Sequence, residues 1–335
     1  MDTLKEDITM KKILALVLAL CLVLALGAVA CADDAVAPKD GGSKVIFSTG
    51  GEAGTYYGFG SVLAQKVSEV TSTSVTAITS GGSAANIDAL DVGDAQLGFS
   101  QSDVLAYAYE GTRTFEELGA VQSFSIVAPL YMEQVQIVTL NPDIKTVADL
   151  AGKTVSIGAA GSGVYFNAID LLGAYGLTEE DIKPTYQSFA DSVESLQDGQ
   201  IDAAFVVAGA PTTAVTSLSA TNQVYLVSLD DEHIDALLES SPYYAKAVIP
   251  AETYGLPEDA VTVAIGAVVI AANDVADVDV YNFLCGVFEN LEDLAKVHDK
   301  ANELSLEFAT SLVGVPYHPG AVQYFADKGI EVPAE

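Results

Sequence analysis

From residue 44 onward, short apolar runs alternate with longer stretches in which apolar residues recur at the spacing of a helix face. Lys44–Ser48 predicts a strand, and the apolar residues between Tyr56 and Val70 fall three or four positions apart. Strands that alternate with helices favour parallel pairing and an α/β fold. The further strands that we expect are Val75–Thr79, Ala95–Ser100, Thr154–Gly158, Ile182–Gln187 and Ala203–Val207. The further helices are Ser83–Val92, with Ser83 as its N-cap, Val164–Tyr175 and Val193–Asp198.

The end of the chain departs from this alternation. Val261–Ala271 is one long apolar run, and Val275–Leu294 predicts a single helix. A stretch that contains Pro and Gly follows, and a last short helix is expected from Gly320.

Two sequence blocks recur in the same order. L-D-V-G-D-A-Q-L-G-F (Leu90–Phe99) shares the spacing of its Leu, Gly and Phe with L-Q-D-G-Q-I-D-A-A-F (Leu196–Phe205), 106 residues later. Upstream, the segment 48–57, with S-T-G and G-T-Y-Y, has a counterpart in 156–166, with S-I-G and G-V-Y-F, 108 to 109 residues later. Two blocks at nearly one offset favour two similar α/β lobes. The alternative is that α/β units share such patterns in general.

Length and charge limit the number of domains and the classes of partner that the protein can have. The chain has 335 residues, enough for about two domains of ~100–200 residues each. It carries 14 Lys and Arg against 46 Asp and Glu, a formal net charge of −32, and Arg113 is its one arginine. A nucleic-acid-binding surface needs clustered Lys and Arg, so nucleic acid is excluded as a partner. We interpret the acidic residues as surface residues that favour solubility.

The N-terminus has the pattern of an export signal. Lys11 and Lys12 precede an uncharged, mostly apolar run that ends in small residues at Ala30, as in a secretory signal peptide. A permanent membrane anchor is the alternative, because about 18 apolar residues can just span a bilayer. We therefore expect residues 1–30 to be a signal peptide, 31–43 a flexible tether, and the mature protein to be extracytoplasmic. Cys31 directly follows the small residues and is the expected lipidation site; ordinary A-x-A cleavage is the alternative.

Signatures of catalysis are scarce, and we expect no enzyme, cofactor or metal site. Gly152-Lys153-Thr154 resembles the end of a phosphate-binding loop, but Val147 stands where that loop needs Gly. Ser162 lies between glycines, yet Ala160 occupies the first Gly position of a nucleophile elbow. The three histidines have no metal-type spacing and are expected to be exposed or to cap helices. Cys285 lies among apolar residues and is expected in the core.

Three expected strand-to-helix turns are rich in Gly and in hydroxyl side chains that could bind a ligand. They are Ser48–Thr55, Ser80–Ser83 and Ser156–Gly163. Each places free backbone N–H groups at a helix N-terminus, where the helix dipole favours a carboxylate or phosphate. Gly permits close approach of a ligand, and Ser or Thr adds a directed hydrogen bond. Ordinary loops with N-caps are the alternative interpretation.

Several motifs resemble the TAXI-type solute-binding proteins of TRAP transporters. They are G-G-E-A-G-T-Y-Y (Gly50–Tyr57), S-G-G-S-A-A-N-I-D-A-L (Ser80–Leu90), G-D-A-Q-L-G-F-S-Q-S-D-V (Gly93–Val104), A-Y-E-G-T (Ala108–Thr112), V-A-D-L-A-G-K-T-V-S-I-G-A-A-G-S-G (Val147–Gly163) and P-Y-H-P-G-A-V-Q-Y-F (Pro316–Phe325). The resemblance implies a two-lobed α/β fold of the periplasmic-binding-protein type II kind, a Venus flytrap with hinge crossovers. It also implies capture of a small organic acid such as glutamate or 2-oxoglutarate, and delivery of that acid to the TRAP membrane permease subunits without ATP.

The resemblance also implies the lobes and the contact residues. One lobe would comprise 44–128 and 262–335, and the other 129–261. The expected ligand-binding residues, of which Ser83 comes from its glycine-rich turn, are Thr55, Tyr56, Ser83, Gln101, Ser102, Tyr131, Ser162, Gly163, Val164 and Tyr165. Arginine commonly clamps carboxylates, but Arg113 is not placed in the cleft, so helix N-termini and hydroxyls would hold the anion. The alternatives are an ABC-type binding lipoprotein for another small anion or a heterocycle, an exported enzyme, and a surface adhesin or sensor.

Overall fold

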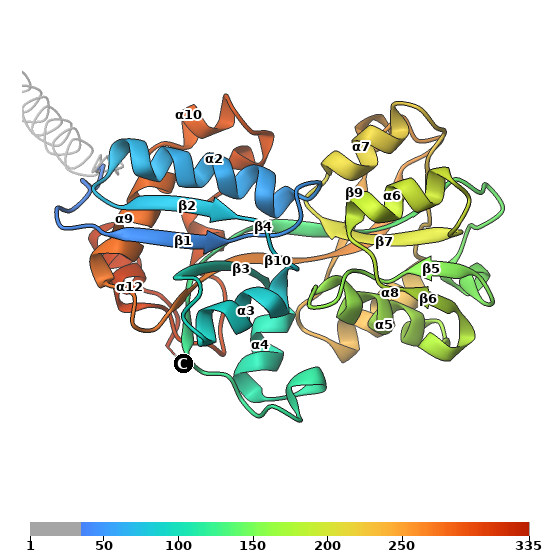
Figure 1. Cartoon of the computed structure of the whole chain (residues 1–335), viewed down its shortest axis with the longest axis horizontal. Helices are drawn as coiled ribbons and strands as arrows, with labels where there is room; N and C mark the ends of the chain where they lie inside the picture. The colour runs from blue at the N-terminus through green and yellow to red at the C-terminus, as the bar shows by residue number, and fades with distance from the viewer. Residues whose placement is uncertain (1–34, 335) are drawn as a thin grey trace, which may run out of the picture. The chain divides into compact units, whose positions relative to one another are not determined.

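One mixed sheet of ten strands organises residues 35–334, the part of the chain that the computed structural model describes (Figure 1). Its order is β2-β1-β3-β10-β4-β7-β5-β6, while β8 pairs with β4 and β9 with β10. The strands are β1 (Lys44–Ser48), β2 (Ser74–Ile78), β3 (Leu97–Gln101), β4 (Phe124–Thr139), β5 (Thr154–Ser156), β6 (Lys183–Thr185), β7 (Ala203–Ala208), β8 (Tyr225–Leu226), β9 (Ala245–Ile249) and β10 (Ala260–Ala272). The expected signal peptide and Cys31 lie outside the described residues.

Helices connect the strands in the predicted alternation. They are α2 (Thr55–Val70), α3 (Ser83–Asp91), α4 (Ser102–Glu110), α5 (Val164–Ala174), α6 (Phe189–Gln197), α7 (Thr213–Ser219), α8 (Asp231–Ser240), α9 (Asp277–Phe288), α10 (Leu291–Ala295), α11 (Leu306–Ala309) and α12 (Pro319–Asp327). Short 3₁₀ helices are η1 (Arg113–Phe115), η2 (Val147–Leu150), η3 (Glu179–Asp181), η4 (Ala251–Thr253) and η5 (Asp299–Glu303). The predicted α/β class is confirmed.

Two parallel half-sheets are joined by two long antiparallel strands. We call β2, β1 and β3 with their helices the first half, and β7, β5 and β6 with theirs the second half; they lie left and right in Figure 1. The joining strands β4 and β10 pair with each other along most of their length. β10 also pairs with β3, and β4 with β7. Both joining strands are almost entirely buried, as long apolar runs require.

The C-terminal segment completes the core of the first half. Phe47 of β1 packs against Phe99 of β3, with ring centroids 4.9 Å apart, and against Phe283 of α9, at 5.6 Å. All three rings are fully buried. Helix α9 lies against α2, and α12 lies against α9. Residues far apart in sequence therefore form one apolar interior, which holds α2 in place.

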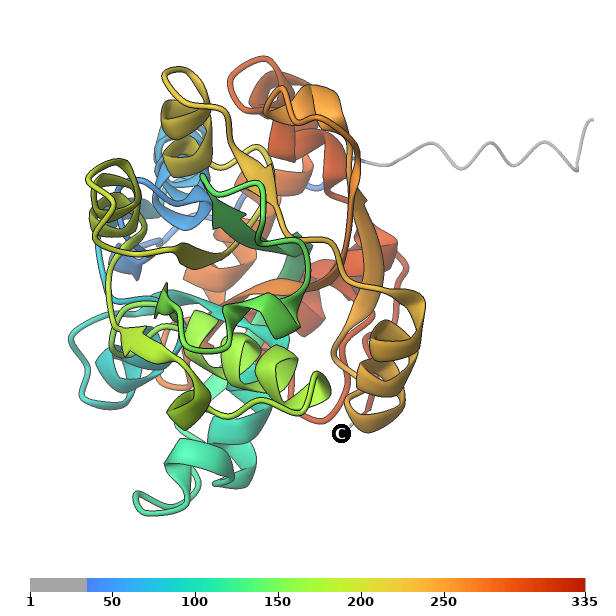
Figure 2. The ribbon, with the colours of Figure 1, turned by 90° about the vertical axis from the view of Figure 1, so that its right-hand side faces the viewer.

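Two layers of helices cover the second half, as Figures 1 and 2 both show. Helices α5 and α8 lie on one face, where Leu171 and Leu237 are buried in a core with Val155 of β5. Helices α6 and α7 lie on the other face, where Leu196 and Val215 are buried. One of the turns that the sequence singled out, Ser156–Gly163, follows β5 of this half.

Two local predictions are wrong. Gly82 and not Ser83 is the N-cap of α3, because the cap residue has a φ of 107°, which Gly adopts without the steric penalty of a side chain. The Ser83 hydroxyl instead accepts a hydrogen bond from the backbone N–H of Gln101, at 3.1 Å. The single helix expected over Val275–Leu294 is two helices, because Asn290 leaves helical geometry between α9 and α10.

The start of the described chain is tied to the first half. The N–H of Lys39 donates to Asn282 Oδ1 of α9 at 2.7 Å, and the Ser43 hydroxyl donates to Asp279 at 2.7 Å. The Lys39 ammonium also lies 3.5 Å from the centre of the Tyr281 ring. Any tether therefore ends before Lys39.

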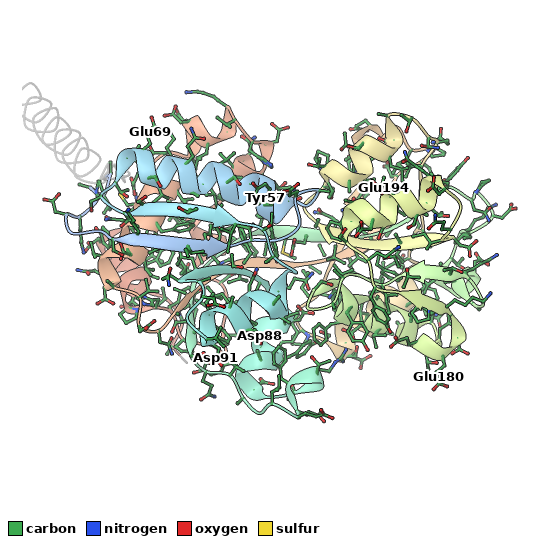
Figure 3. The ribbon with its side chains drawn as sticks, viewed as in Figure 1. Tyr57, Glu69, Asp88, Asp91, Glu180 and Glu194 are labelled. Atoms are coloured by element: carbon green, nitrogen blue, oxygen red, sulfur yellow. The ribbon has the colours of Figure 1, made fainter. Side chains whose placement is uncertain are left out.

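Acidic side chains gather on the outside. Glu69, Glu180 and Glu194, on three separate elements, point away from the sheet (Figure 3) and are exposed. This position agrees with an acidity that favours solubility. Among residues 35–334, no helix is both long and apolar enough to span a membrane.

Candidate functional site

A cavity lies where glycine-rich turns from both halves meet. Its volume is about 80 Å³, counted as the space that the centre of a water molecule can occupy. On this measure one water needs about 10–15 Å³, so the cavity suits a small molecule. Its walls are Gly50, Gly51, Gly54, Thr55, Tyr56, Ser80, Gly81, Gly82, Ser83, Gln101, Glu133, Ala159, Ser162, Gly163, Val164, Gln187, Ser188, Phe189, Val207 and Ala208.

All three predicted turns reach this cavity, because each follows the carboxyl end of a parallel strand, and the antiparallel strands β4 and β10 turn the carboxyl ends of the two half-sheets toward each other. Helices α2, α3 and α5 begin there, with Gly54, Gly82 and Gly163 as their N-caps. The first N–H groups of each helix have no partner within the helix and lie at the positive end of its dipole. Together the three ends form an environment suited to an anion.

A fourth helix N-terminus, which the sequence reasoning missed, completes the wall. Helix α6 begins at Phe189, and its N-cap Ser188 accepts a hydrogen bond from the N–H of Asp191. The expected helix at Val193–Asp198 therefore starts too late. The signal was present as a Ser followed three residues later by an acid, which is typical of a helix start.

Hydrogen bonds join the two halves beside the cavity. The Thr55 hydroxyl donates to the Gly209 carbonyl at 2.8 Å, and the N–H of Ala85 donates to the Gly161 carbonyl at 3.0 Å. A third bond runs from the N–H of Ala214 to the carbonyl of residue 53, at 3.0 Å. The halves therefore contact each other on more than one side of the cavity.

A buried network behind the cavity links the halves through Asn167 of α5. Gln101 Nε2 donates to Asn167 Oδ1 at 2.9 Å, and Asn167 Nδ2 donates to Asp103 Oδ2 at 3.1 Å and to the Tyr244 hydroxyl at 2.8 Å. Tyr244 in turn donates to Asp170 at 3.1 Å. Burial raises the pKa of Asp103 to about 7.

Two polar atoms in the cavity wall are buried without a hydrogen-bond partner among the described residues. They are Gln101 Oε1 and Ser162 Oγ. Gln101 is 2% exposed and Ser162 is 8% exposed. Buried polar atoms are rarely left without a partner in proteins. Both residues line the cavity, so a bound molecule is a candidate partner for these atoms.

Glu133 places a carboxyl in the same wall, from the middle of β4. The Tyr56 hydroxyl donates to its Oε2 at 2.7 Å, and the Tyr56 ring stacks on Phe99 with centroids 4.5 Å apart. The pKa of Glu133 is raised to about 8, mainly by burial and in part by the nearby Asp103, while the Tyr56 hydrogen bond and the charge of Lys300 oppose the shift. The sequence reasoning missed this residue, although a lone acid inside a long apolar strand is itself a signal.

A profile of the NMT1-like family matches residues 47–329. That match spans both halves and the whole cavity wall. The chain belongs to the NMT1-like family. Its fold is the α/β periplasmic-binding-protein type II fold, as expected.

Solved structures agree with this fold. The alkanesulfonate-binding protein SsuA from Xanthomonas axonopodis pv. citri, bound to MOPS, is 16% identical, with 89% of this chain and 96% of that chain covered and a TM-score of 0.50. A protein from Bordetella bronchiseptica RB50 is also 16% identical, with 84% and 88% covered and a TM-score of 0.52. At these identities the comparison concerns the fold.

The cationic side chains near the cavity of this NMT1-like protein, Arg113 and Lys300, lie outside its wall. The described residues that line it include no Lys, Arg or His. Arg113 instead pairs with Asp170 of α5, with Nη2 2.6 Å from Oδ1, and lies over the Tyr107 ring. Lys300 is 3% exposed and pairs with Glu303, near Glu133 but outside the wall. Anion binding in the cavity would therefore depend on N–H groups and hydroxyls.

Seven of the ten predicted contact residues line the cavity: Thr55, Tyr56, Ser83, Gln101, Ser162, Gly163 and Val164. Three do not. The Ser102 hydroxyl accepts from the N–H of Gly266, at 3.2 Å, and Tyr131 packs among buried aromatic rings with 1% exposure. Tyr165 borders a neighbouring depression, and its hydroxyl donates to Glu179 at 3.2 Å.

The histidines cap helices or stack on an aromatic ring, and Cys285 is part of the core. His298 and His318 accept hydrogen bonds as N-caps, as predicted, and His233 stacks on Tyr175 at 3.7 Å between ring centroids. Cys285 is buried in α9. Within residues 35–334, no three His, Cys, Asp or Glu side chains gather as a metal site would require.

The two buried acids predict an unusual pH dependence of stability. Asp103 and Glu133 have folded-state pKa values of about 7 and about 8, above those of an unfolded chain. The folded protein therefore binds more protons than the unfolded one between about pH 4 and 8, so the free energy of unfolding falls as pH rises through this range. We expect urea unfolding to show a loss on the order of a few kcal/mol from pH 5 to 8.

The matched control is the double variant Asp103→Asn with Glu133→Gln, which removes both titrating groups and keeps their shape. Its stability should change much less over the same range. An equally steep change in the double variant would assign the pH dependence to the acidic surface instead.

Proposed function

We propose that this protein is the extracytoplasmic substrate-binding subunit of a TRAP-type secondary transporter, close to the TAXI group. It would capture a small organic acid of the glutamate or 2-oxoglutarate kind and deliver it to the membrane permease. The observation that carries the proposal is a cavity on which four helix N-termini converge, whose wall includes Ser162 and Gln101, each with a buried polar atom that has no partner among the described residues. The TAXI-like motifs supply three of these four turns.

The proposed binding cycle is a hinge motion. β4 and β10 are the strands that join the halves, and the expected lobe boundaries at 128/129 and 261/262 fall within them. Bending there would open the cavity, and a ligand would bring the halves back together. The contacts from Thr55 and Ala85 to the second half would form on closure. Lipidation of Cys31 would keep the protein at the membrane surface.

The alternative is an ABC-type binding lipoprotein for another small anion. Similarity in fold to an alkanesulfonate-binding protein favours including sulfonates as candidates. A sulfonate would use the same helix N-termini, because it too is a compact anion. The two transport systems differ in their source of energy, so uptake by the reconstituted permease with an ion gradient and without ATP would separate them.

The test is a ligand screen with the mature protein. Glutamate, glutamine, 2-oxoglutarate, succinate, simple monocarboxylates and a short alkanesulfonate would be compared by thermal shift and calorimetry. A true ligand should raise stability by RT ln(1 + [L]/Kd), which is about 2.7 kcal/mol at a hundredfold excess over Kd. The chain has no Trp, so closure has to be followed by calorimetry rather than by tryptophan fluorescence. If no organic acid binds, the proposal is wrong; binding of the sulfonate alone would favour the alternative.

A further inference from the structure

We propose that Glu133 and Gln101 Oε1 form a subsite for a protonated amine, so that the ligand carries an ammonium and an anionic group on one small molecule. This inference rests on the proposed function and narrows it. An organic acid without an amine would satisfy the helix N-termini and leave these two acceptors unmatched. An amino acid would satisfy both ends of the cavity.

The first support is the orientation of Gln101, which its neighbours fix. Asn167 Nδ2 donates to Asp103 Oδ2 and to the Tyr244 hydroxyl, so Asn167 Oδ1 is left as an acceptor. Gln101 Nε2 occupies that acceptor at 2.9 Å, which leaves Oε1 as the free end of the amide. This oxygen only accepts hydrogen bonds. Gln101 lines the cavity, and its Oε1 is buried beside Gly163 with no partner among the described residues.

The second support is the carboxyl of Glu133 in the same wall. It is 2% exposed, and no described Lys or Arg lies within 4 Å to pair with it. The Tyr56 hydroxyl supplies one hydrogen bond, to Oε2. An ionised carboxyl buried without a cation is costly, so Glu133 keeps its proton in the free protein, and a ligand ammonium would allow it to ionise. A keto or methylene group at the same place would not.

The groups that face Glu133 come from four elements. They are Tyr56 on α2, Asp103 on α4, Tyr131 on β4 itself and Lys300 on η5. Of these, Lys300 carries a positive charge but pairs with Glu303. Burial raises the pKa of Glu133 to about 8, so this carboxyl is mainly protonated at pH 7 before a ligand binds. An ammonium beside it favours the ionised form, and binding should therefore release a proton.

Matched ligand pairs test the subsite. Glutamate differs from 2-oxoglutarate, and alanine from pyruvate, by an amine in place of a keto oxygen. The amine member of at least one pair should bind about tenfold or more tightly, measured by calorimetry at pH 7. If a ketoacid binds as tightly as its amino acid, the subsite is wrong while the proposed function stands. If neither member of either pair binds and the screen finds no organic acid, the proposed function fails, and the subsite with it.

The variant Glu133→Gln keeps the shape and can still accept from Tyr56. It should lose about tenfold or more in affinity for the amino acid and leave a ketoacid unaffected or better bound. Unchanged affinity for the amino acid would overturn the subsite.

A measurement on the unchanged protein tests the subsite even if Glu133→Gln folds poorly. Calorimetry in two buffers of different ionisation enthalpy should detect close to one proton released per amino acid bound at pH 7. The variant Asp103→Asn should release the same proton, which would exclude Asp103 as its source. No proton release in either protein would overturn the inference.

Discussion

Gly163→Ala is expected to weaken ligand binding about a hundredfold while the free protein stays folded. The backbone at Gly163 has φ −70° and ψ −21°, which Ala adopts readily, so the effect comes from contact alone. A Cβ there would lie 1.7 Å from Gln101 Oε1 and 2.8 Å from Ser83 Oγ in the other half. Gln101 would have to leave Asn167 and turn into a cavity of only about 80 Å³. The lost buried hydrogen bond and the occupied space together cost about 3 kcal/mol.

The control is Gly173→Ala in the same helix, α5. A Cβ at Gly173 meets no atom within 4 Å, so this variant should bind normally and be slightly more stable, because Ala favours a helix over Gly. Calorimetry with the ligand that the screen identifies would compare the two variants. Normal affinity in Gly163→Ala would mean that the ligand binds without the two halves approaching as they do here.

Asn167→Leu is expected to weaken ligand binding about thirtyfold or more. The leucine side chain has a similar size but no polar atoms. It leaves the Gln101 amide N–H and the Asp103 carboxyl buried without their present partner. Each such group costs about 1–3 kcal/mol, so together they cost at least about 2 kcal/mol. In an open form water reaches both groups, and the cost therefore falls mainly on the closed form that holds the ligand.

The effect of Asn167→Leu should appear in affinity more than in the melting temperature of the free protein. Asn222→Leu is the control, since the hydrogen bonds of Asn222 are exposed to solvent. Its affinity should match that of the unchanged protein. A large loss of melting temperature in Asn167→Leu without any change in affinity would assign the network to stability alone.

Much of the site follows from local sequence. A glycine-rich turn between an apolar run and a helical pattern fixes a helix N-terminus at the end of a strand. Parallel pairing then brings such ends to one edge within each half-sheet. This reasoning singled out the turns that contain Thr55 and Ser162, the family resemblance added Gln101, and all three residues line one cavity. The N-cap of α3 was misassigned by one residue, because Gly82 and Ser83 are both acceptable caps by residue type alone.

Other features depend on pairings that no local pattern records. Arg113 meets Asp170 across 57 residues, which removes the one arginine from the cavity. Gln101 meets Asn167 across 66 residues, and that bond decides which end of its amide is left without a partner. Tyr131 is buried among aromatic rings because β4 passes through the centre of the sheet.

The alternation of apolar runs and the glycine-rich turns determined the α/β fold and the helix N-termini at the strand ends, since strand, turn and helix propensities act within a few residues. The convergence of those N-termini required the antiparallel pairing of β4 and β10. The character of the cavity was decided only by the tertiary structure. Glu133 is an ordinary acid in the sequence, and it becomes a buried group in the cavity wall because two distant half-sheets are joined through β4 and exclude water around it.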